Sequence, residues 1–181
     1  LPIDMIATSH GVIWRDNPLQ IVQKYVEWAQ DYREDQITIV YDTMWEGTRV
    51  MAEHIARGIT AADPKVNVKL QNCAKRDKND IITDIFRSKG LVLGSPTIGK
   101  GILTAVAALL EEVRGLRFKG KKAAAFGCYG WSGEAVGLLE KALADGGFSV
   151  VGGGLKLLWN PTEEGRQQCV EYGRRLAEEL G

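Results

Sequence analysis

The chain has 181 residues, of which 45% are hydrophobic and 21 are glycine. Basic and acidic residues both total 23, so the formal net charge is zero, which argues against a nucleic-acid partner or attraction to a membrane surface. The sequence has neither an apolar run of about 18 residues nor a signal peptide, and we expect a cytoplasmic globular protein.

The three cysteines, Cys73, Cys128 and Cys169, are odd in number and far apart in the sequence. Their spacing fits neither a disulfide framework nor a zinc site. We therefore expect reduced thiols in an intracellular protein.

Residues 1–36 differ in character from the rest of the chain. Asn17-Pro18 predicts a helix cap and a proline in the first turn. A helix is expected from about Pro18 to Tyr32, with apolar residues at helical spacing: Leu19, Val22, Tyr25, Val26 and Ala29. We expect this segment to pack against a surface either within this chain or outside it, and the missing initial Met suggests a piece of a longer protein.

From Ile37 onward, strands and helices are expected to alternate. Strands are predicted near 37–42, 67–73, 90–95, 122–127 and 149–157, and helices near 48–61, 78–88, 102–114, 133–146 and 162–179. Each strand is a continuous apolar run, as expected when helices cover both faces of a parallel sheet. Helix ends are predicted from Asn79/Asp80, Thr162 and Gly146-Gly147. The pattern predicts an α/β protein with a doubly wound, five-stranded parallel sheet.

Three loops follow predicted strands and contain small and polar residues: TMWEGT at 43–48, SPTIGKG at 95–101 and CYGWSGE at 128–134. Loops at the carboxyl ends of parallel strands meet at one edge of the sheet, where ligands bind. The first loop precedes a helix, whose free N–H groups and dipole suit a phosphate.

Other phosphate-binding motifs are excluded. The first loop lacks the G-x-G-x-x-G of a dinucleotide site, and Gly99-Lys100-Gly101 lacks the hydroxyl residue and spacing of a P-loop. Asp42 stands alone, without the acidic cluster of a phospho-receiver. We expect a monophosphate held without a cation by the hydroxyls of Thr43 and Thr48 and by backbone N–H groups, although Thr and Gly are also common in structural turns.

Aromatic residues in these loops point to a planar ligand. Trp45, Tyr129 and Trp131 all fall where small polar residues are usual, and they could stack on a flat ring. A monophosphate joined to a flat tricyclic ring describes FMN. We expect Trp131 and Tyr129 to wall the ring and Trp45 to cover the phosphate side or ring edge. Quenched flavin fluorescence should then recover in Trp131→Ala but not in Trp159→Ala.

Three motifs carry a family resemblance: YDTMWEGT at 41–48, GSPTIGKGIL at 94–103 and FGCYGWSGE at 126–134. With them, the chain from about Ile37 to its end resembles the flavodoxin-like domain of the flavodiiron proteins, which are oxygen and nitric oxide reductases. SHGVIWRDNP at 9–18 is similar to the end of the metallo-β-lactamase-like diiron domain that precedes it in this family. The resemblance implies domains at 1–36 and 37–181 and a strand order of 2-1-3-4-5.

The resemblance and the loops together assign the binding residues. His10 is implied as an iron ligand in the intact protein only, whereas a lone loop histidine is otherwise usually a hydrogen-bonding residue, and His54 is expected to be solvated. FMN is expected to be bound by Thr43, Met44, Trp45, Glu46, Gly47, Thr48, Ser95, Pro96, Thr97, Ile98, Gly99, Lys100, Cys128, Tyr129, Gly130, Trp131, Ser132 and Gly133.

The implied function is electron transfer within an oxidoreductase. Electrons would pass from a rubredoxin-type donor to a diiron centre in the same or a partner chain, in a homo-oligomer when full length. The fragment alone would be only a carrier. Glu46-Gly47, Gly99-Lys100 and Cys128 depart from relatives at points that affect redox tuning, and Lys100 is expected near the pyrimidine end of the ring.

Two other functions remain open from the sequence. The chain could be a free-standing flavodoxin-type carrier or FMN-dependent quinone reductase, which the SHGVIWR motif disfavours. It could also be a structural α/β domain without cofactor, which a colourless preparation would reveal.

Overall fold

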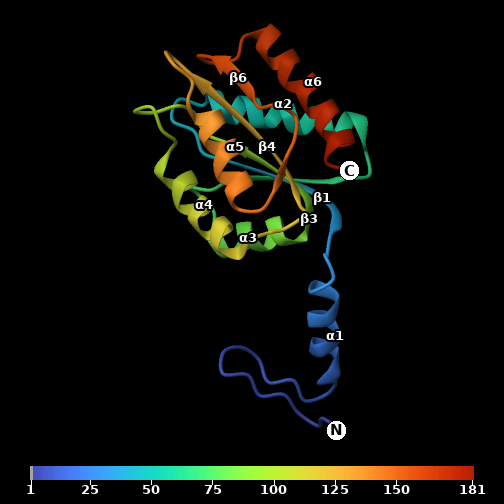
Figure 1. Cartoon of the computed structure of the whole chain (residues 1–181). Coiled ribbons are helices and arrows are strands. Elements are labelled where there is room, and N and C mark those ends of the chain that lie inside the picture. The colour runs from blue at the N-terminus through green and yellow to red at the C-terminus, as the bar shows by residue number, and fades with distance from the viewer. Residues whose placement is uncertain (1) are drawn as a thin grey trace. The chain divides into compact units, whose positions relative to one another are not determined.

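The computed structural model describes residues 2–181, and the chain divides between Tyr32 and Arg33 into two compact units. In the first unit, the backbones of Ile6 and Trp14 pair in an antiparallel bridge with two N–H to C=O bonds of 3.0 Å. Helix α1 (Leu19–Trp28) follows (Figure 1). No residue of α1, all of which the structure describes, is buried, so its apolar stripe lies exposed.

Two details of the α1 prediction are wrong. The helix ends at Trp28 instead of Tyr32, with Ala29 as its C-cap. The N-cap is Pro18, without a side-chain cap, and Asn17 contributes only its carbonyl, which accepts from the Gln20 N–H at 3.1 Å. Pro18 already has a helical φ of −63°, so the chain enters the helix without help from the Asn17 side chain.

The second unit contains a parallel sheet in the order β2-β1-β3-β4-β5, which confirms the predicted order (Figure 1). Its strands are β1 (Glu34–Tyr41), β2 (Asn67–Asn72), β3 (Ser88–Gly94), β4 (Lys122–Tyr129), β5 (Ser149–Val150) and β6 (Leu155–Leu158). β1 begins three residues before its predicted start, and β4 extends through Cys128 and Tyr129, which were expected in a loop.

The predicted single strand 149–157 is wrong, because it is split in two. β5 pairs with Lys122 and Ala123 at the start of β4, whereas β6 pairs with Phe126–Tyr129 at its end. Gly152, Gly153 and Gly154 between them all have positive φ, which breaks the strand. β6 therefore runs beside the end of β4 and delivers its own end to the carboxyl edge of the sheet.

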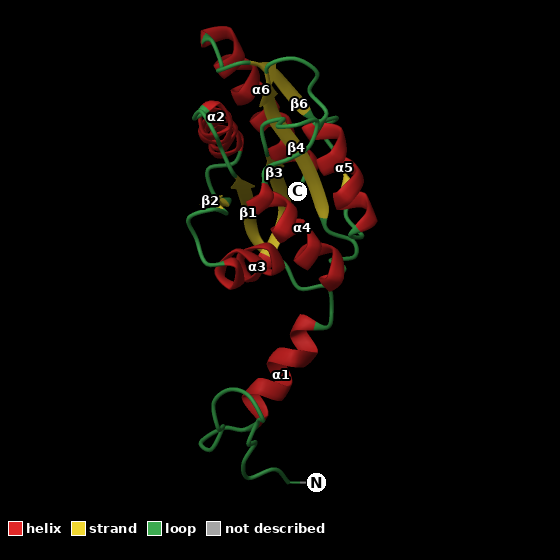
Figure 2. Ribbon diagram, turned by 90° about the vertical axis from the view of Figure 1, so that its left-hand side faces the viewer, coloured by secondary structure: helices red, strands yellow, loops and turns green. Residues whose placement is uncertain are grey.

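Helices cover both faces of the sheet, as predicted (Figure 2). One core packs α2 (Gly47–Ala62) and α6 (Glu163–Glu179) on Ile37, Ile39 and Tyr41 of β1. Val40 of the same strand points into the other core, with α3 (Lys78–Arg87), α4 (Thr104–Leu116) and α5 (Ala135–Asp145). The alternation along β1 follows from the period of two in a strand.

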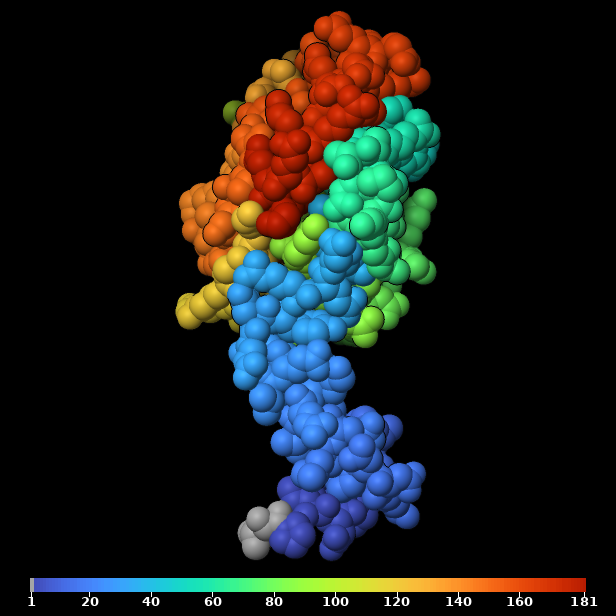
Figure 3. Space-filling view, turned by 90° about the vertical axis from the view of Figure 1, so that its right-hand side faces the viewer, coloured from blue at the N-terminus to red at the C-terminus, as the bar shows by residue number. Residues whose placement is uncertain are grey.

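The helices α2 and α6 lie side by side on their face of the sheet (Figure 3). Glycine makes this close approach possible at both helices. An added Cβ at Gly58 would stand 2.1 Å from the Val170 carbonyl oxygen, and one at Gly173 would stand 2.2 Å from that of Ile55.

In the second unit, the helix ends agree with prediction at two of three positions. Thr162 caps α6 through its hydroxyl, which accepts from the Gly165 N–H at 3.3 Å, and Gly146-Gly147 ends α5. The prediction of Asn79/Asp80 as the cap of α3 is wrong. Asp77 takes that position, with its carboxylate accepting from the Asn79 N–H at 2.8 Å, because its extended backbone lets the side chain turn back.

Candidate functional site

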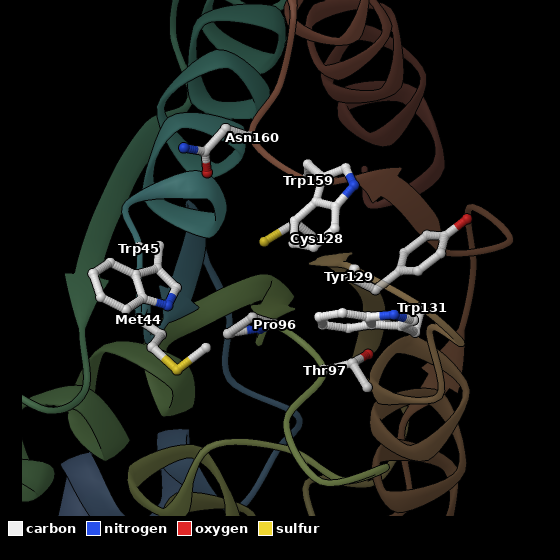
Figure 4. A pocket seen from close by; sticks show the side chains of 10 residues that line it. Met44, Trp45, Pro96, Thr97, Cys128, Tyr129, Trp131, Trp159 and Asn160 are labelled. Atoms are coloured by element: carbon white, nitrogen blue, oxygen red, sulfur yellow. The ribbon is translucent and has the colours of Figure 1, made fainter.

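A cavity of about 500 Å³ lies at the carboxyl edge of the sheet (Figure 4). Four segments supply its walls: the β1–α2 loop, the β3–α4 loop, the end of β4 with the loop after it, and the turn between β6 and α6. Met44 and Trp45 stand on one side and Trp131 and Trp159 on the other. The lining residues are Met44, Trp45, Pro96, Thr97, Cys128, Tyr129, Gly130, Trp131, Trp159 and Asn160.

The β1–α2 loop joins the end of β1 to the first turn of α2. Asp42 accepts from the Thr43 N–H at 2.8 Å, and Glu46 adopts a left-handed φ of 64° before the helix begins at Gly47. No side chain caps this helix among the described residues, so its first N–H groups are left for another acceptor.

The two threonines of this loop differ in their hydrogen bonding. Thr48 is fully buried, and its hydroxyl lies 3.4 Å from the Cys128 sulfur. The Thr43 hydroxyl is buried too, and among residues 2–181 it finds no hydrogen-bond partner. A buried polar atom without a partner is costly, so its presence indicates a group that the protein itself does not provide.

One cation beside the loop pairs with two carboxylates. Arg49 donates through Nε to Glu46 and through a terminal nitrogen to Glu53. Hydrogen bonds to Glu46 and then Glu53 raise the pKa of the Arg49 guanidinium. The negative charge that Glu46 brings to the loop therefore has a cation directly beside it.

The β3–α4 loop is held in place by hydrogen bonds. The Ser95 hydroxyl donates to the Pro96 carbonyl at 2.9 Å and accepts from the Leu103 N–H at 3.0 Å, while Thr97 accepts from the Ala135 N–H at 3.1 Å. Ile98 and Gly101 exchange backbone bonds across a tight turn, with positive φ at Gly99 and Lys100. Pro96 and Thr97 reach the cavity, whereas Ser95 serves the loop itself.

The end of β4 forms the aromatic side of the cavity. Trp131 is 88% exposed, and its ring meets the edge of Trp159 with centroids 5.2 Å apart at 70°. The Tyr129 ring lies over Gly133, where an added Cβ would stand 3.1 Å from it. On the opposite side Trp45 is 77% exposed. Exposed indoles that flank an apolar cavity are suited to stack on a planar ligand.

Beyond the cavity, the loop after β4 contains a small polar cluster. The Ser132 hydroxyl donates to Glu134 at 2.8 Å, and this bond is the main cause of a lowered pKa for the Glu134 carboxyl. The positive charges of Lys100 and Lys156 add to the effect. Lys100 therefore lies near enough to Glu134 to influence its charge.

Eight of the predicted binding residues line the cavity: Met44, Trp45, Pro96, Thr97, Cys128, Tyr129, Gly130 and Trp131. The others lie in the same loops without appearing in its lining: Thr43, Glu46, Gly47, Thr48, Ser95, Ile98, Gly99, Lys100, Ser132 and Gly133. The three predicted loops thus meet at one place, with the threonines of the β1–α2 loop next to the apolar wall.

Sequence reasoning missed Trp159 and Asn160, and it used Trp159→Ala only as a fluorescence control, whereas Trp159 lines the cavity beside Trp131. The split of the last strand explains the error, because β6 pairs with the end of β4 and carries both residues to the cavity. Gly152-Gly153-Gly154 was the available signal, since three consecutive glycines interrupt a strand.

The two histidines lie outside this cavity. His10 is exposed, and residues 2–181 contain no group of three or more His, Cys, Asp or Glu side chains arranged to hold a metal. His54 is half-buried, with Nδ1 2.8 Å from the Val50 carbonyl oxygen on α2. His54 was expected to be solvated, but one of its ring nitrogens instead lies within hydrogen-bond distance of a carbonyl of its own helix.

The cysteines are free thiols, and burial raises the pKa of both Cys73 and Cys169 to about 12. For Cys73 the Asp42 carboxylate adds to the shift.

Among residues 2–181, no helix is both long and apolar enough to cross a bilayer.

Comparison with known proteins gives a consistent result. Residues 39–173 match the family model described as Flavodoxin. The anaerobic nitric oxide reductase flavorubredoxin of Escherichia coli is 53% identical over 177 residues, which cover 98% of this chain and 37% of that protein. The chain thus spans little more than a third of that relative.

Solved structures agree with this similarity. Rubredoxin oxygen:oxidoreductase from the anaerobe Desulfovibrio gigas superposes with a TM-score of 0.90 at 35% identity, over 98% of this chain and 44% of that one. A flavodoxin from the domain Archaea superposes with a TM-score of 0.71 at 28% identity, over 80% of this chain and 98% of that one.

Proposed function

The chain belongs to the flavodoxin family and corresponds to the flavodoxin domain of a flavodiiron protein, and from this we propose that its cavity binds FMN for electron transfer. The observation that carries the proposal is the unpartnered Thr43 hydroxyl beside an uncapped helix start, next to an apolar cavity flanked by indoles. Family membership alone implies the cofactor, and the remaining question is whether these residues suit it.

The phosphate end fits a monophosphate without a bound cation. Thr43 would donate its hydroxyl hydrogen to a phosphate oxygen, and the N–H groups of residues 44–48 would add further donors. An ester phosphate offers the acceptors that Thr43 lacks. The Arg49 charge is already compensated by Glu46 and Glu53, so backbone dipoles and neutral hydroxyls would bind the phosphate.

The ring end fits a flat aromatic group. A cavity of about 500 Å³ falls within the range of cofactor sites, and its walls are mainly apolar. Trp131 and Trp45 on opposite sides would stack on or cover the ring and exclude water from it. Bound FMN supplies the redox chemistry, while the chain binds, orients and shields it.

The wider role of the chain rests on its relatives. We propose that the intact protein is an oxygen or nitric oxide reductase, in which a rubredoxin-type donor supplies electrons and a diiron centre receives them. Residues 1–36 would be the end of the diiron domain, and His10 would ligate iron together with residues outside this chain, in a homo-oligomer. A cytoplasmic location belongs to the same proposal.

The test is the visible spectrum of the purified chain, with its phosphorus and iron content. We expect a yellow protein with flavin absorption bands, one phosphorus per chain and no iron. A preparation that stays colourless after incubation with FMN contradicts the proposal. Iron in the full-length protein would separate a flavodiiron reductase from a free-standing flavodoxin-type carrier.

A further inference from the structure

The turn between β6 and α6 touches two separate walls of the cavity. Trp159 lies against the segment after β4, and Asn160 lies against the start of α2. Both residues line the cavity, yet neither belongs to the three loops described above. The turn therefore connects the aromatic wall with the β1–α2 loop.

Trp159 is held in an unusual backbone conformation. Its φ is 56°, in the left-handed region that bulky side chains rarely adopt. Its N–H donates to the Tyr129 carbonyl at 2.7 Å, which extends the pairing of β6 with β4 beyond the end of the strand. Such a conformation persists only where the surroundings fix it, and it is common at binding sites.

The Trp159 indole supports Trp131. Its six-membered ring rests on Gly130, where an added Cβ would stand 2.8 Å from Cη2. From that position it meets Trp131 edge to face, with the centroids 5.2 Å apart. Trp131 is 88% exposed, so this ring contact restrains a side chain that is otherwise largely surrounded by solvent.

Asn160 makes the second connection. Its Oδ1 lies 2.6 Å from the place where a Cβ at Gly47 would stand, which puts the amide directly over the first residue of α2. Gly47 precedes the buried Thr48 and follows the left-handed Glu46. The Asn160 side chain is thus packed on the backbone that would bind the phosphate.

We infer that Trp159 and Asn160 form a positioning element for the flavin, in which Trp159 orients Trp131 against the ring and Asn160 supports the β1–α2 loop that would bind the phosphate. The inference rests on the proposed function. It predicts that the two residues act on different parts of the ligand, because each contacts a different wall.

Riboflavin and FMN distinguish the two parts, since riboflavin has the ring without the phosphate. In Trp159→Ala, we expect both affinities to fall by the same factor, about 2- to 12-fold, the range that one aromatic pair predicts. The residual fluorescence of the bound flavin should rise, because Trp131 no longer quenches it from a fixed position. In Asn160→Ala, we expect FMN affinity to fall more than riboflavin affinity.

Three further variants separate positioning from folding. Trp159→Gly suits the positive φ, so its flavin-free form should unfold at no lower temperature while flavin binding still weakens. Trp159→Phe retains a ring and should restore most of the affinity. Trp28→Ala removes a tryptophan of α1, which belongs to the other unit, and should change neither affinity nor fluorescence.

Unchanged affinity and fluorescence in both Trp159→Ala and Trp159→Gly would overturn the role of Trp159. Equal loss of riboflavin and FMN binding in Asn160→Ala, or no loss, would overturn that of Asn160. A wild-type chain that binds neither flavin would instead refute the proposed function, so the two failures are distinguishable.

Discussion

Among single residues, the hydroxyls of Thr43 and Thr48 in the β1–α2 loop differ in whether they have a hydrogen-bond partner. Thr48 has the Cys128 sulfur nearby, whereas Thr43 is buried without a partner among the described residues. An unmet buried donor destabilises the ligand-free protein and becomes favourable when a ligand supplies an acceptor. The same atom therefore connects stability with binding.

For Thr43→Val, we expect opposite effects on stability and binding. Removal of the unmet hydroxyl should raise the free energy of unfolding of the flavin-free chain by about 1 kcal/mol. FMN affinity should fall about tenfold through the lost phosphate contact, with riboflavin affinity unchanged. Chemical denaturation and flavin titration measure the two quantities.

Thr48→Val provides the comparison, because Thr48 already has a partner. It should weaken FMN binding far more than riboflavin binding and should not raise stability. If Thr43→Val and Thr48→Val each weaken the binding of FMN and riboflavin by the same factor, the phosphate is bound elsewhere.

Lys100 offers a second test at this scale. It stands on an exposed turn and does not line the cavity, but its charge reaches Glu134. If it also reaches the pyrimidine end of the flavin, it favours the reduced, more negative ring. Lys100→Asn should then lower the midpoint potential by on the order of tens of millivolts, with a smaller effect at high salt.

Glu134→Gln is the matched control for Lys100, because it removes the opposite charge from the same cluster and should shift the potential upward. A potential that does not respond to Lys100→Asn at low ionic strength would show that this lysine is only a solvated turn residue.

At the scale of elements, the packing of α2 on α6 decides how the site is supported. α2 begins with the last residues of the β1–α2 loop, and farther along the helix Gly58 packs against Gly173 of α6. An alanine at either position would meet a backbone carbonyl, which cannot move aside as a side chain can. The glycines therefore fix the separation of the two helices.

We expect Gly58→Ala and Gly173→Ala each to lower the free energy of unfolding by about 1–3 kcal/mol, the usual cost of overpacking. Gly115→Ala in α4 and Gly137→Ala in α5 are matched controls, because an added Cβ there meets nothing within 4 Å. These two should raise stability by about 0.5–1 kcal/mol. Equal effects in both pairs, measured by denaturant unfolding, would contradict the importance of the close contact.

At the scale of the whole molecule, binding and electron relay have different requirements. Both hydrophobic cores consist of residues from Ile37 onward, and every residue that lines the cavity comes from the second unit. Flavin binding should therefore need only that unit. The proposed transfer of electrons to a diiron centre would need metal ligands from outside this chain.

Removal of residues 1–32 tests this separation. We expect a chain of residues 33–181 to keep its FMN affinity within about twofold and its unfolding temperature within a few degrees, since no core residue is lost. Flavin titration and thermal unfolding provide the measurements. A large loss of affinity would show that the first unit takes part in the binding site.

The strand order was implied by the family resemblance, whereas the alternation of strands and helices and the three loops that meet at the site could be predicted from the residues themselves. These follow from local patterns: apolar runs for buried strands, a helical period for the covering helices, and Thr, Gly and aromatic residues at strand ends. Thr43, Thr48 and Trp131 could be selected because their neighbours in the chain already placed them at such ends.

Which residues of distant segments meet depends on the tertiary structure. The division of the last strand depends on how β6 pairs with β4, and that pairing brings Trp159 onto Gly130 and Asn160 onto Gly47. The unmet Thr43 hydroxyl and the contact of Gly58 with Gly173 likewise depend on atoms far away in the sequence. Local propensity is fixed by neighbouring residues, whereas such contacts depend on the packing of the whole domain, which no short pattern encodes.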